Sequence, residues 1–294
     1  YSKTNVQVEG VDEADIVKSD GRYIYAFSKN RLVIVDAYPA ESGKIVSTTE
    51  LAGLTPQEMF ISGNMLLIFA QPDYGYGNYG QENSTLQRRY SYYGGGTVVQ
   101  LLDIRDRAKP VMEKEIEFSG SYLTSRLIGK NAYFVINSYP NYGPCGFYGC
   151  RGFEESDMGT EPATGTKPAA DQNNIVPMMT EDGVEKRIAD VREIGYIPPM
   201  PIQSFVTIAS LNLDSKRLEK ETIAASAQSV FASEENIYLA STAWLANEPV
   251  PPKDGNASVI GDIEAGAKIA AQKVIGIPGR ILYGDSEKTV INKF

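Results

Sequence analysis

The alternation of apolar and polar side chains between residues 15 and 51 predicts four short β-strands. Residues 22–27 (RYIYAF) alternate aromatic with aliphatic side chains, and residues 32–35 (LVIV) are a run of strongly β-favouring residues. Turn-forming residues separate these segments, so the expected strands are residues 15–18, 22–27, 31–36 and 44–51. Four consecutive antiparallel strands of this length form one sheet, which needs similar sheets beside it to bury both of its faces.

The same pattern recurs along the chain. Residues 59–70 (MFISGNMLLIFA) repeat the first hairpin, and residues 97–104 and 112–118 repeat the third and fourth strands. Further copies of these strands follow at residues 126–136, 205–213, 218–224, 230–240 and 289–294. A repeated four-stranded unit with about 40 core residues is typical of a β-propeller, although the Gly-His and Trp-Asp signatures of WD40 blades are missing here.

These repeats predict an all-β fold, a β-propeller of four-stranded antiparallel blades in a single domain over residues 1–294. The chain supplies about three and a half blades, which we place at residues 11–55, 56–119, 120–226 and, incomplete, 227–294. A propeller closes by joining its last blade to its first, and open sheet edges promote aggregation. We therefore expect this chain to be the N-terminal part of a larger ring, with the remaining blades on the same precursor or on another chain.

The connections between the second and third strands of the units differ greatly in length. In the first unit the connection is residues 28–30, but in the others it covers residues 71–96, 137–204 and 241–288. In a four-stranded blade this connection and the crossover to the next blade open on the same side. We therefore expect the long insertions on one face of the propeller, where such folds usually bind their partners.

Two segments within the insertions carry apolar side chains at helical spacing. Residues 184–194 place Val184, Ile188 and Val191 on one face of a helix, and residues 262–275 show the same spacing. The sequence therefore predicts two short helices inside the insertions.

Composition excludes several classes of activity. The chain has no His, which excludes an imidazole base, a Ser-His-Asp or Cys-His arrangement and a His-ligated metal. Its net charge is −9 and no basic run exceeds Arg88-Arg89, so nucleic acid is not an expected partner. No apolar run reaches transmembrane length. The chain opens at Tyr1 without Met, so we expect a processed or trimmed chain, in which a missing signal peptide is no evidence against secretion.

The insertions are rich in Tyr and Gly, which makes them the leading candidate for a binding surface. Tyr offers a flat apolar face and a hydroxyl with little entropy to lose, and Gly and Asn allow adaptable backbone contacts. A surface protein or a glycan suits such a surface, and a self-packed loop that covers the propeller is the alternative. The candidate binding residues are Tyr74, Tyr76, Tyr79, Tyr90, Tyr92, Tyr93, Tyr142 and Tyr148.

Acidic residues form a cluster just before the first predicted strand. Asp12, Glu13 and Asp15 could hold Ca²⁺ together with backbone carbonyls, because Ca²⁺ takes an oxygen-only shell, although their spacing is not that of an EF-hand. Turn capping and solvated charge are the alternative. Asp103 and Asp106 have the spacing to shape the turn between the third and fourth strands of the second unit.

Two further patterns concern Cys and Asn residues in the insertions, and a disulfide among them would point to an oxidising compartment. Cys145 and Cys150 lie in a Gly-rich stretch that suits a short local disulfide, with a metal site, a redox pair or free thiols as alternatives. Asn83 and Asn256 begin Asn-x-Ser/Thr patterns for N-glycosylation, and both lie in insertions.

The opening of the chain resembles a known family. Residues 5–18 (NVQVEGVDEADIVK) followed by residues 20–25 (DGRYIY) are similar to the start of secreted archaeal and bacterial proteins that contain a β-propeller domain distantly related to WD40 repeats. Residues 35–39 (VDAYP) and 204–208 (SFVTI) also fit. The resemblance implies a propeller, an extracellular or cell-surface location and a longer whole protein. It implies no established reaction, so it carries over no catalytic residues.

The expected function is an exported, cell-surface binding or assembly module that acts through the insertion face, with no catalytic activity evident. A carbohydrate-active hydrolase that needs no His is one alternative, and it requires two carboxylates about 5–10 Å apart. A structural subunit of a surface layer or filament is another, in which a neighbouring chain completes the strand edges.

Overall fold

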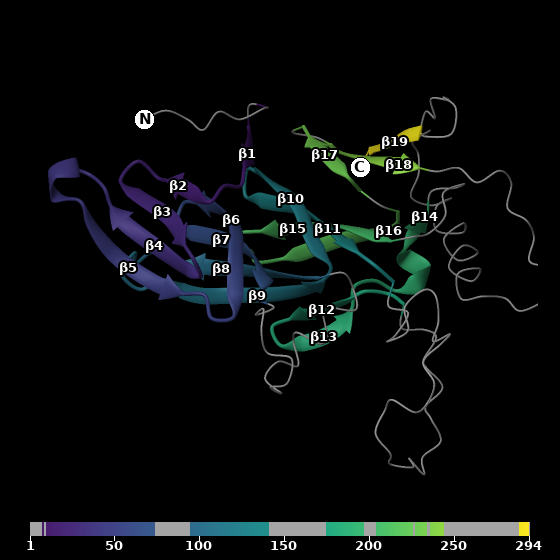
Figure 1. The fold of residues 1–294 in the computed structure, drawn as a ribbon, viewed down its shortest axis with the longest axis horizontal. Coiled ribbons are helices and arrows are strands. Elements are labelled where there is room, and N and C mark those ends of the chain that lie inside the picture. Colours follow the sequence, from purple (N-terminus) through teal and green to yellow (C-terminus); the bar gives the residue numbers. More distant parts are fainter. Residues whose placement is uncertain are drawn as a thin grey trace, which may run out of the picture.

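The computed structural model describes residues 8, 10–73, 95–140, 175–196, 204–225, 227–233, 236–243 and 288–293. They form four β-sheets that stand side by side in chain order (Figure 1). The helical turns described are two short 3₁₀ segments, η1 (Ala40–Ser42) and η3 (Val191–Glu193). No helix in this part of the chain is long and apolar enough to span a membrane.

The first sheet follows chain order because tight turns join its strands. These strands are β2 (Val17–Ser19), β3 (Tyr23–Ser28), β4 (Arg31–Asp36) and β5 (Lys44–Glu50). In the β2–β3 turn the Asp20 carboxylate accepts hydrogen bonds from the amides of Arg22 at 3.1 Å and Tyr23 at 2.8 Å, and Gly21 has a φ of +95°. Side-chain-bearing residues rarely adopt this φ, so the Asp-Gly pair determines the turn.

The next two sheets contain the same four-strand order, and the last contains three strands. The second unit consists of β6 (Leu54–Ser62), β7 (Met65–Pro72), β8 (Gly96–Asp103) and β9 (Val111–Ser119). The third unit consists of β10 (Ser121–Ile128), β11 (Asn131–Ser138), β15 (Phe205–Asn212) and β16 (Leu218–Ala224). The fourth sheet consists of β17 (Ser229–Ala232), β18 (Ile237–Ala243) and β19 (Lys288–Lys293). The predicted strands are confirmed, although β6 and β10 begin earlier than expected.

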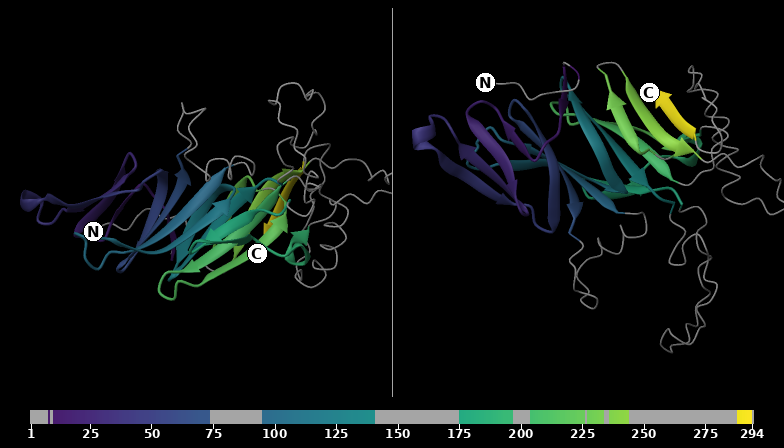
Figure 2. Two further views of the ribbon diagram at one scale, coloured as in Figure 1. Left: turned by 90° about the horizontal axis from the view of Figure 1, so that it is seen from below. Right: turned by 45° about the horizontal axis from the view of Figure 1, so that its top comes forward.

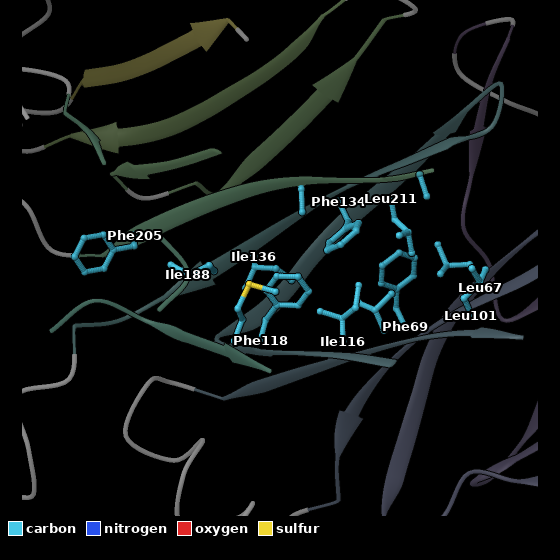
Figure 3. Close-up of a cluster of buried hydrophobic side chains, with 14 of the residues drawn as sticks. Leu67, Phe69, Leu101, Ile116, Phe118, Phe134, Ile136, Ile188, Phe205 and Leu211 are labelled. Atoms are coloured by element: carbon cyan, nitrogen blue, oxygen red, sulfur yellow. The ribbon is translucent and has the colours of Figure 1, made fainter. Parts of the chain in front are cut away.

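Apolar side chains fill the space between neighbouring sheets. Figure 2 shows the sheets stacked from purple to green, and a buried cluster lies between each successive pair. Between the second and third units, Phe69 and Phe118 each meet Phe134 edge to face, with centroids 5.3 Å and 5.6 Å apart (Figure 3). Strands β7 and β8 are buried along almost their whole length because they are covered on both faces.

Arg107 links the first two units at the β2–β3 end of the sheets. Its guanidinium donates from Nε to the Tyr25 hydroxyl at 3.1 Å and from Nη1 to Asn64 Oδ1 at 2.9 Å. It also lies 3.4 Å from Asp20 Oδ2. Burial raises the pKa of Tyr25 to about 12, so its hydroxyl stays protonated and donates to Asp20 at 2.9 Å. The link therefore carries no ionisation step near neutral pH.

The segment that enters the first unit contacts the second and third units on its way. Strand β1 (Val11–Glu13) pairs antiparallel with β10, the first strand of the third unit, where Val11 lies opposite Ile128. Asp15 then forms a two-way backbone bridge with Met59 of β6, the first strand of the second unit. One short stretch of chain therefore touches the first strands of two units before becoming the first strand of its own unit.

The long connection between the second and third strands of the third unit, which we call the third insertion, extends two sheets at their outer edges with its described residues. Strand β12 (Met178–Glu181) pairs with β9 and with β13 (Val184–Arg187), and β14 (Gly195–Tyr196) runs parallel to β16. These residues therefore lie at the rim of the second and third units. The expectation that long insertions decorate one face stays a prediction for the insertion residues outside the described ranges.

The helix predicted for residues 184–194 is wrong. Its first four residues form strand β13, and the Asp182-Gly183 pair before them makes a two-residue hairpin turn with φ of +50° and +80°. Asp-Gly is favoured in such turns because both positions need positive φ. The hairpin signal therefore outweighs the helical spacing of apolar residues. The helix predicted for residues 262–275 lies outside the described residues.

Candidate functional site

The described residues include the ends of the insertions that were predicted to bind a partner. The eight candidate tyrosines, Cys145 and Cys150, and Asn83 and Asn256 lie outside the described residues, so the predictions for them stay predictions. The insertion of the second unit, which we call the second insertion, leaves the sheet at Asp73 and returns at Gly95. The third insertion, in the third unit, leaves after Ser138. The geometry at these points shows how firmly the insertions are attached.

Both ends of the second insertion are bound to connections between units. The Asp73 amide donates to the Gly53 carbonyl at 2.8 Å, and Gly53 lies in the connection from the first unit to the second. The Gly95 carbonyl accepts from the Gly120 amide at 2.9 Å, and Gly120 lies in the connection from the second unit to the third. The two ends of the insertion are therefore held at the crossovers on either side of its own unit.

Three buried hydroxyls reinforce the second of these crossovers, and we call Thr97, Ser119 and Ser138 the hydroxyl cluster. Thr97 Oγ1 donates to the Gly120 carbonyl at 2.8 Å, and Ser138 Oγ donates to the Ser119 carbonyl at 2.5 Å. Ser119 Oγ donates to the Met178 carbonyl at 2.6 Å and accepts from the Met178 amide at 2.9 Å. All three residues are 1% exposed or less. The cluster therefore joins the crossover to β8, to β11 and to the returning part of the third insertion.

The crossover from the third unit to the fourth is held in a similar way. Ser204, which ends the third insertion, is 5% exposed and donates from Oγ to the Ala225 carbonyl at 2.8 Å. Asn137, the second-last residue of β11 before that insertion leaves the sheet, donates from Nδ2 to the Ala227 carbonyl at 2.7 Å. Hydrogen bonds to buried carbonyls are costly to leave unmade, so these side chains hold the chain ends in place.

The hydroxyl cluster has the chemistry of an anchor. Each of its hydroxyls donates to a backbone carbonyl, and an activated nucleophile would instead donate to a basic side chain. The arrangement can therefore fix the insertions in position, and it supplies no reacting group of its own.

The acidic cluster at the start of the first unit is divided between separate partners. Asp12 Oδ1 lies 2.9 Å from Lys18 Nζ, and Glu13 Oε1 lies 3.3 Å from Arg126 Nη2. Asp15 Oδ1 accepts a hydrogen bond from the next backbone amide at 2.6 Å. The structure does not gather these three carboxylates into a ligand set, and the described part of the chain contains no group of three or more His, Cys, Asp or Glu arranged to hold a metal.

A partly buried network lies between the first strands of the second and third units. The Tyr122 hydroxyl donates to Glu58 Oε2 at 2.5 Å and lies 2.7 Å from Ser125 Oγ. Burial and the nearby Glu58 carboxylate raise the pKa of Tyr122 far above its ordinary value. The Tyr122 ring stacks on Phe69 at 4.8 Å. Glu58 is therefore held by Tyr122, just as Asp12 and Glu13 are held by cations.

The two aspartates expected to shape the β8–β9 turn do so. Asp103 Oδ1 accepts from the Arg105 amide at 2.8 Å, and Asp106 Oδ1 accepts from the Ala108 amide at 3.0 Å.

The sequence did not predict the hydroxyl cluster, because a Ser or Thr in a strand carries no local mark of burial. The Ser-Gly-Ser run at residues 119–121 was the available signal, since it separates two strand patterns as a tight crossover would.

Comparisons with known proteins agree with this architecture. The family model described as "Beta propeller domain" matches residues 1–284. The chain belongs to this family. Its strand units are therefore propeller blades. The first contains β2–β5, the second β6–β9, the third β10, β11, β15 and β16, and the fourth β17–β19.

Two curated relatives of the propeller chain are archaeal. An uncharacterized protein of Archaeoglobus fulgidus is 34% identical over 156 residues, which are 49% of this chain and 21% of the relative. The uncharacterized protein MJ1554 of Methanocaldococcus jannaschii is 28% identical over 136 residues, which are 46% of this chain and 17% of the relative. The matched part thus spans about a fifth of each relative's length.

Proposed function

We propose that this propeller is an exported binding or assembly module that engages its partner through the long insertions between the second and third strands of its blades. The observation that carries the proposal is the anchoring of those insertions. Gly95, Ser138 and Ser204, at insertion ends, all bond to blade crossovers. Loops on a rigid scaffold can diverge in sequence without cost to the fold, which is why recognition residues concentrate there.

The composition of the insertions supports a surface protein or a glycan as the partner. Tyr side chains stack on sugar rings and on apolar protein surfaces, and their hydroxyls provide hydrogen bonds at little entropic cost. An extracellular or cell-surface location is supported by the resemblance of residues 5–18 to secreted proteins and by the Cys145 and Cys150 pair.

The assembly part of the proposal concerns the rest of the ring. The described part of the fourth blade has three strands, and the curated relatives are much longer than the matched segment. We propose that further blades, on the same polypeptide, complete the propeller.

Substituting the insertion tyrosines tests the binding role. The triple variant Tyr76→Ala, Tyr79→Ala and Tyr92→Ala of the whole protein is compared with the wild type on a glycan array and in pull-downs from the cell envelope. We expect at least a tenfold loss of affinity for the retained ligand, about 1.4 kcal/mol, because the flat contact area is removed.

A matched control substitutes exposed apolar residues away from the insertions. Val111→Ala and Met112→Ala change side chains that are 48% and 45% exposed on β9, and they should leave binding unchanged. A wild type that retains nothing in either assay, or tyrosine variants that bind as the wild type does, would refute the binding role.

A further inference from the structure

The outer edges of the second and third blades each carry an added strand. Strand β12 pairs antiparallel with β9, and β14 pairs parallel with β16. The first sheet ends at β5, which has no further strand beside it among the described residues. Outer edges in this molecule therefore accept additional strands in either direction, and one such edge is still available.

Strand β5 of the first blade corresponds closely to β9 of the second. Each strand contains one β-bulge, and counting from it places Thr48 at the position of Glu115 and Glu50 at the position of Glu117. The strand added to β9 lies at these positions, where the Asp182 amide donates to the Glu115 carbonyl at 3.3 Å. The equivalent backbone positions on β5 are therefore placed for the same kind of pairing.

The backbone of β5 directs hydrogen-bonding groups away from its sheet. The Leu51 amide donates to the Asn30 carbonyl at 2.8 Å, so Leu51 bonds inward. Bonded and non-bonded positions alternate along an antiparallel ladder, so Thr48 and Glu50 direct their amide and carbonyl groups outward. The residues beyond the bulge, 47–49 (STT), include none of the charges or prolines that usually protect a sheet edge. An extended segment can therefore pair with β5 here.

The second sheet continues outward where the first sheet stops. It has six strands, because β12 and β13 lie beyond β9 (Figure 1). Gln100 of β8 pairs with Ile68, which belongs to the cluster between the first two blades, and on its other side with Glu115. Directly paired residues share a sheet face, so Glu115 lies on the face that is turned to the first blade.

The outer part of that face is acidic. Glu117 lies two residues from Glu115 on β9, and Thr180 pairs with both Glu117 and Glu185, so all of them share the face. Glu115 and Glu185 are exposed and Glu117 is half-buried, with Arg187 two residues further along β13. We call Glu115, Glu117 and Glu185 the acidic ledge.

A buried acceptor lies at the inner border of the acidic ledge. Gln100 is 6% exposed, and its side-chain amide is directed at the ledge, since Nε2 donates to Glu115 Oε2 at 2.7 Å. Gln100 Oε1 is buried and has no hydrogen-bond partner among the described residues. Buried polar atoms are normally paired, so this oxygen indicates a donor that the described chain does not supply. Acceptors and negative charge together favour a partner that brings N–H donors and positive charge.

We propose that the β5 edge and the acidic ledge form a docking site for an extended basic segment of a partner protein. The backbone of the segment pairs with Thr48 and Glu50 as β12 pairs with β9, which is strand addition to an exposed sheet edge. Lys or Arg side chains at alternate positions of the segment then meet the ledge. The net charge of −9 favours the approach of such a partner.

The same strand geometry explains why this partner differs from β12. Met179 of β12 lies in the apolar cluster between the second and third blades, so the strand added to β9 has an apolar inner face. The inner face of a strand added to β5 lies beside carboxylates, so it is basic. The site lies at the outer rim and uses none of the insertion tyrosines, so it is a second binding activity beside the one proposed above.

Fluorescence anisotropy with synthetic peptides and the whole protein tests the site. The probe is Lys-Thr-Lys-Val-Lys-Thr-Lys, which places all its Lys side chains on one face of a strand, and its match replaces every Lys with Glu. We expect the basic peptide to bind at least about tenfold more tightly than the acidic one. A basic peptide N-methylated at alternate residues keeps the charge but loses the edge hydrogen bonds, and it should bind at least about fivefold more weakly than the parent.

Protein variants separate the two parts of the site. Thr48→Pro removes one outward amide at an edge position, and the double variant Glu117→Gln, Glu185→Gln removes two charges of the ledge. Each should weaken binding of the basic peptide at least about fivefold. Glu41→Gln removes an exposed carboxylate of η1 away from the ledge and should leave binding unchanged.

Three results would overturn the inference. Equal affinity for the basic and acidic peptides would exclude recognition by the ledge, and equal affinity for the parent and N-methylated peptides would reduce binding to non-specific charge attraction. A dimer in sedimentation velocity that Thr48→Pro dissociates would show that a second copy of the chain occupies the edge. The triple tyrosine variant should bind the basic peptide as the wild type does, so failure at the rim and failure at the insertions are distinguishable.

Discussion

Single residues at the blade crossovers determine how the insertions are held. Gly120 has a φ of +134°, and a Cβ there would lie 2.2 Å from Ser138 Oγ and 2.6 Å from the Asn137 carbonyl oxygen. The same position donates to Gly95 and accepts from Thr97. Only Gly allows the crossover to pass this close to the hydroxyl cluster.

Gly120→Ala is expected to lower the free energy of unfolding by at least about 2 kcal/mol, because an unfavourable φ and a backbone clash add together. Urea unfolding measures the loss. Gly129→Ala is the control, since Gly129 has a φ of +60° with no atom within 4 Å of the added Cβ, and it should lose only about 1 kcal/mol. Equal losses for the two variants would contradict the crowded crossover.

Asp20 makes the link between the first two blades sensitive to acid. Burial alone would raise its pKa, but hydrogen bonds from the amides of Tyr23 and Arg22 and the hydroxyl of Tyr25, with the charge of Arg107, hold its pKa below the ordinary 3.8. A carboxylate with a lowered folded-state pKa contributes stability above the unfolded pKa and loses it as pH falls through the folded pKa.

Asp20→Asn should therefore cost about 1 kcal/mol of unfolding free energy at pH 7, with the difference from wild type shrinking below about pH 4. Urea unfolding at pH 7 and pH 3 checks both parts. Asp214→Asn removes a carboxylate whose side chain is 63% exposed and 3.4 Å from Lys130, and should cost under about 0.5 kcal/mol at either pH. A cost for Asp20→Asn that is the same at both pH values would contradict the linkage.

At the scale of elements, the rim strands seal the seam between the second and third blades. The returning insertion adds β12 and β13 to one blade and β14 to the next, and it buries Ile188, Ile194 and Tyr196 in the cluster between them. The Ile188 amide donates to the Pro177 carbonyl at 2.8 Å. This insertion is therefore both a candidate recognition loop and a clamp across two blades.

Ile188→Ala is expected to cost about 2–5 kcal/mol, because it leaves a cavity at a position that is 0% exposed. Val184 on β13 of the same hairpin is 65% exposed, so Val184→Ala should change stability by less than about 0.5 kcal/mol. Thermal unfolding of both variants decides the matter. Similar melting temperatures for the two would show that the rim strands do not contribute to the seam.

At the scale of the whole molecule, the absence of His and the pattern of pKa shifts both reduce the number of groups that titrate near neutral pH. Among the described residues, every resolved shift moves a group further from neutrality: the pKa values of Asp20, Asp36, Asp103 and Glu181 are lowered, and those of the affected Arg, Lys and Tyr groups are raised. None of these groups therefore changes its charge near pH 7.

The free energy of unfolding should consequently vary by less than about 0.5 kcal/mol between pH 6 and 8, since the chain has no His and none of the groups with a resolved pKa shift titrates there. Urea midpoints at pH 6, 7 and 8 measure this. A change above about 1 kcal/mol centred within that range would reveal a buried carboxylate or thiol that titrates near neutrality.

The amino-acid pattern was sufficient for the strands and their fourfold repetition. Alternating side chains and turn residues such as Asp20-Gly21 act over a few positions, so they can be interpreted without knowing any distant contact. The turn roles of Asp103 and Asp106 are local for the same reason, and they were predicted correctly.

Tertiary structure decided the features that join distant parts of the chain. Residues 184–194 carry apolar side chains that suit a helix, yet they form a strand and a 3₁₀ turn. Strand β13 pairs with β12, and β12 pairs with β9, so the segment extends an existing sheet. Ser119 meets Met178 from 59 positions away, and Arg107 meets Tyr25 from 82 positions away. Neighbouring residues contain no information about such partners, because packing of whole sheets brings them together.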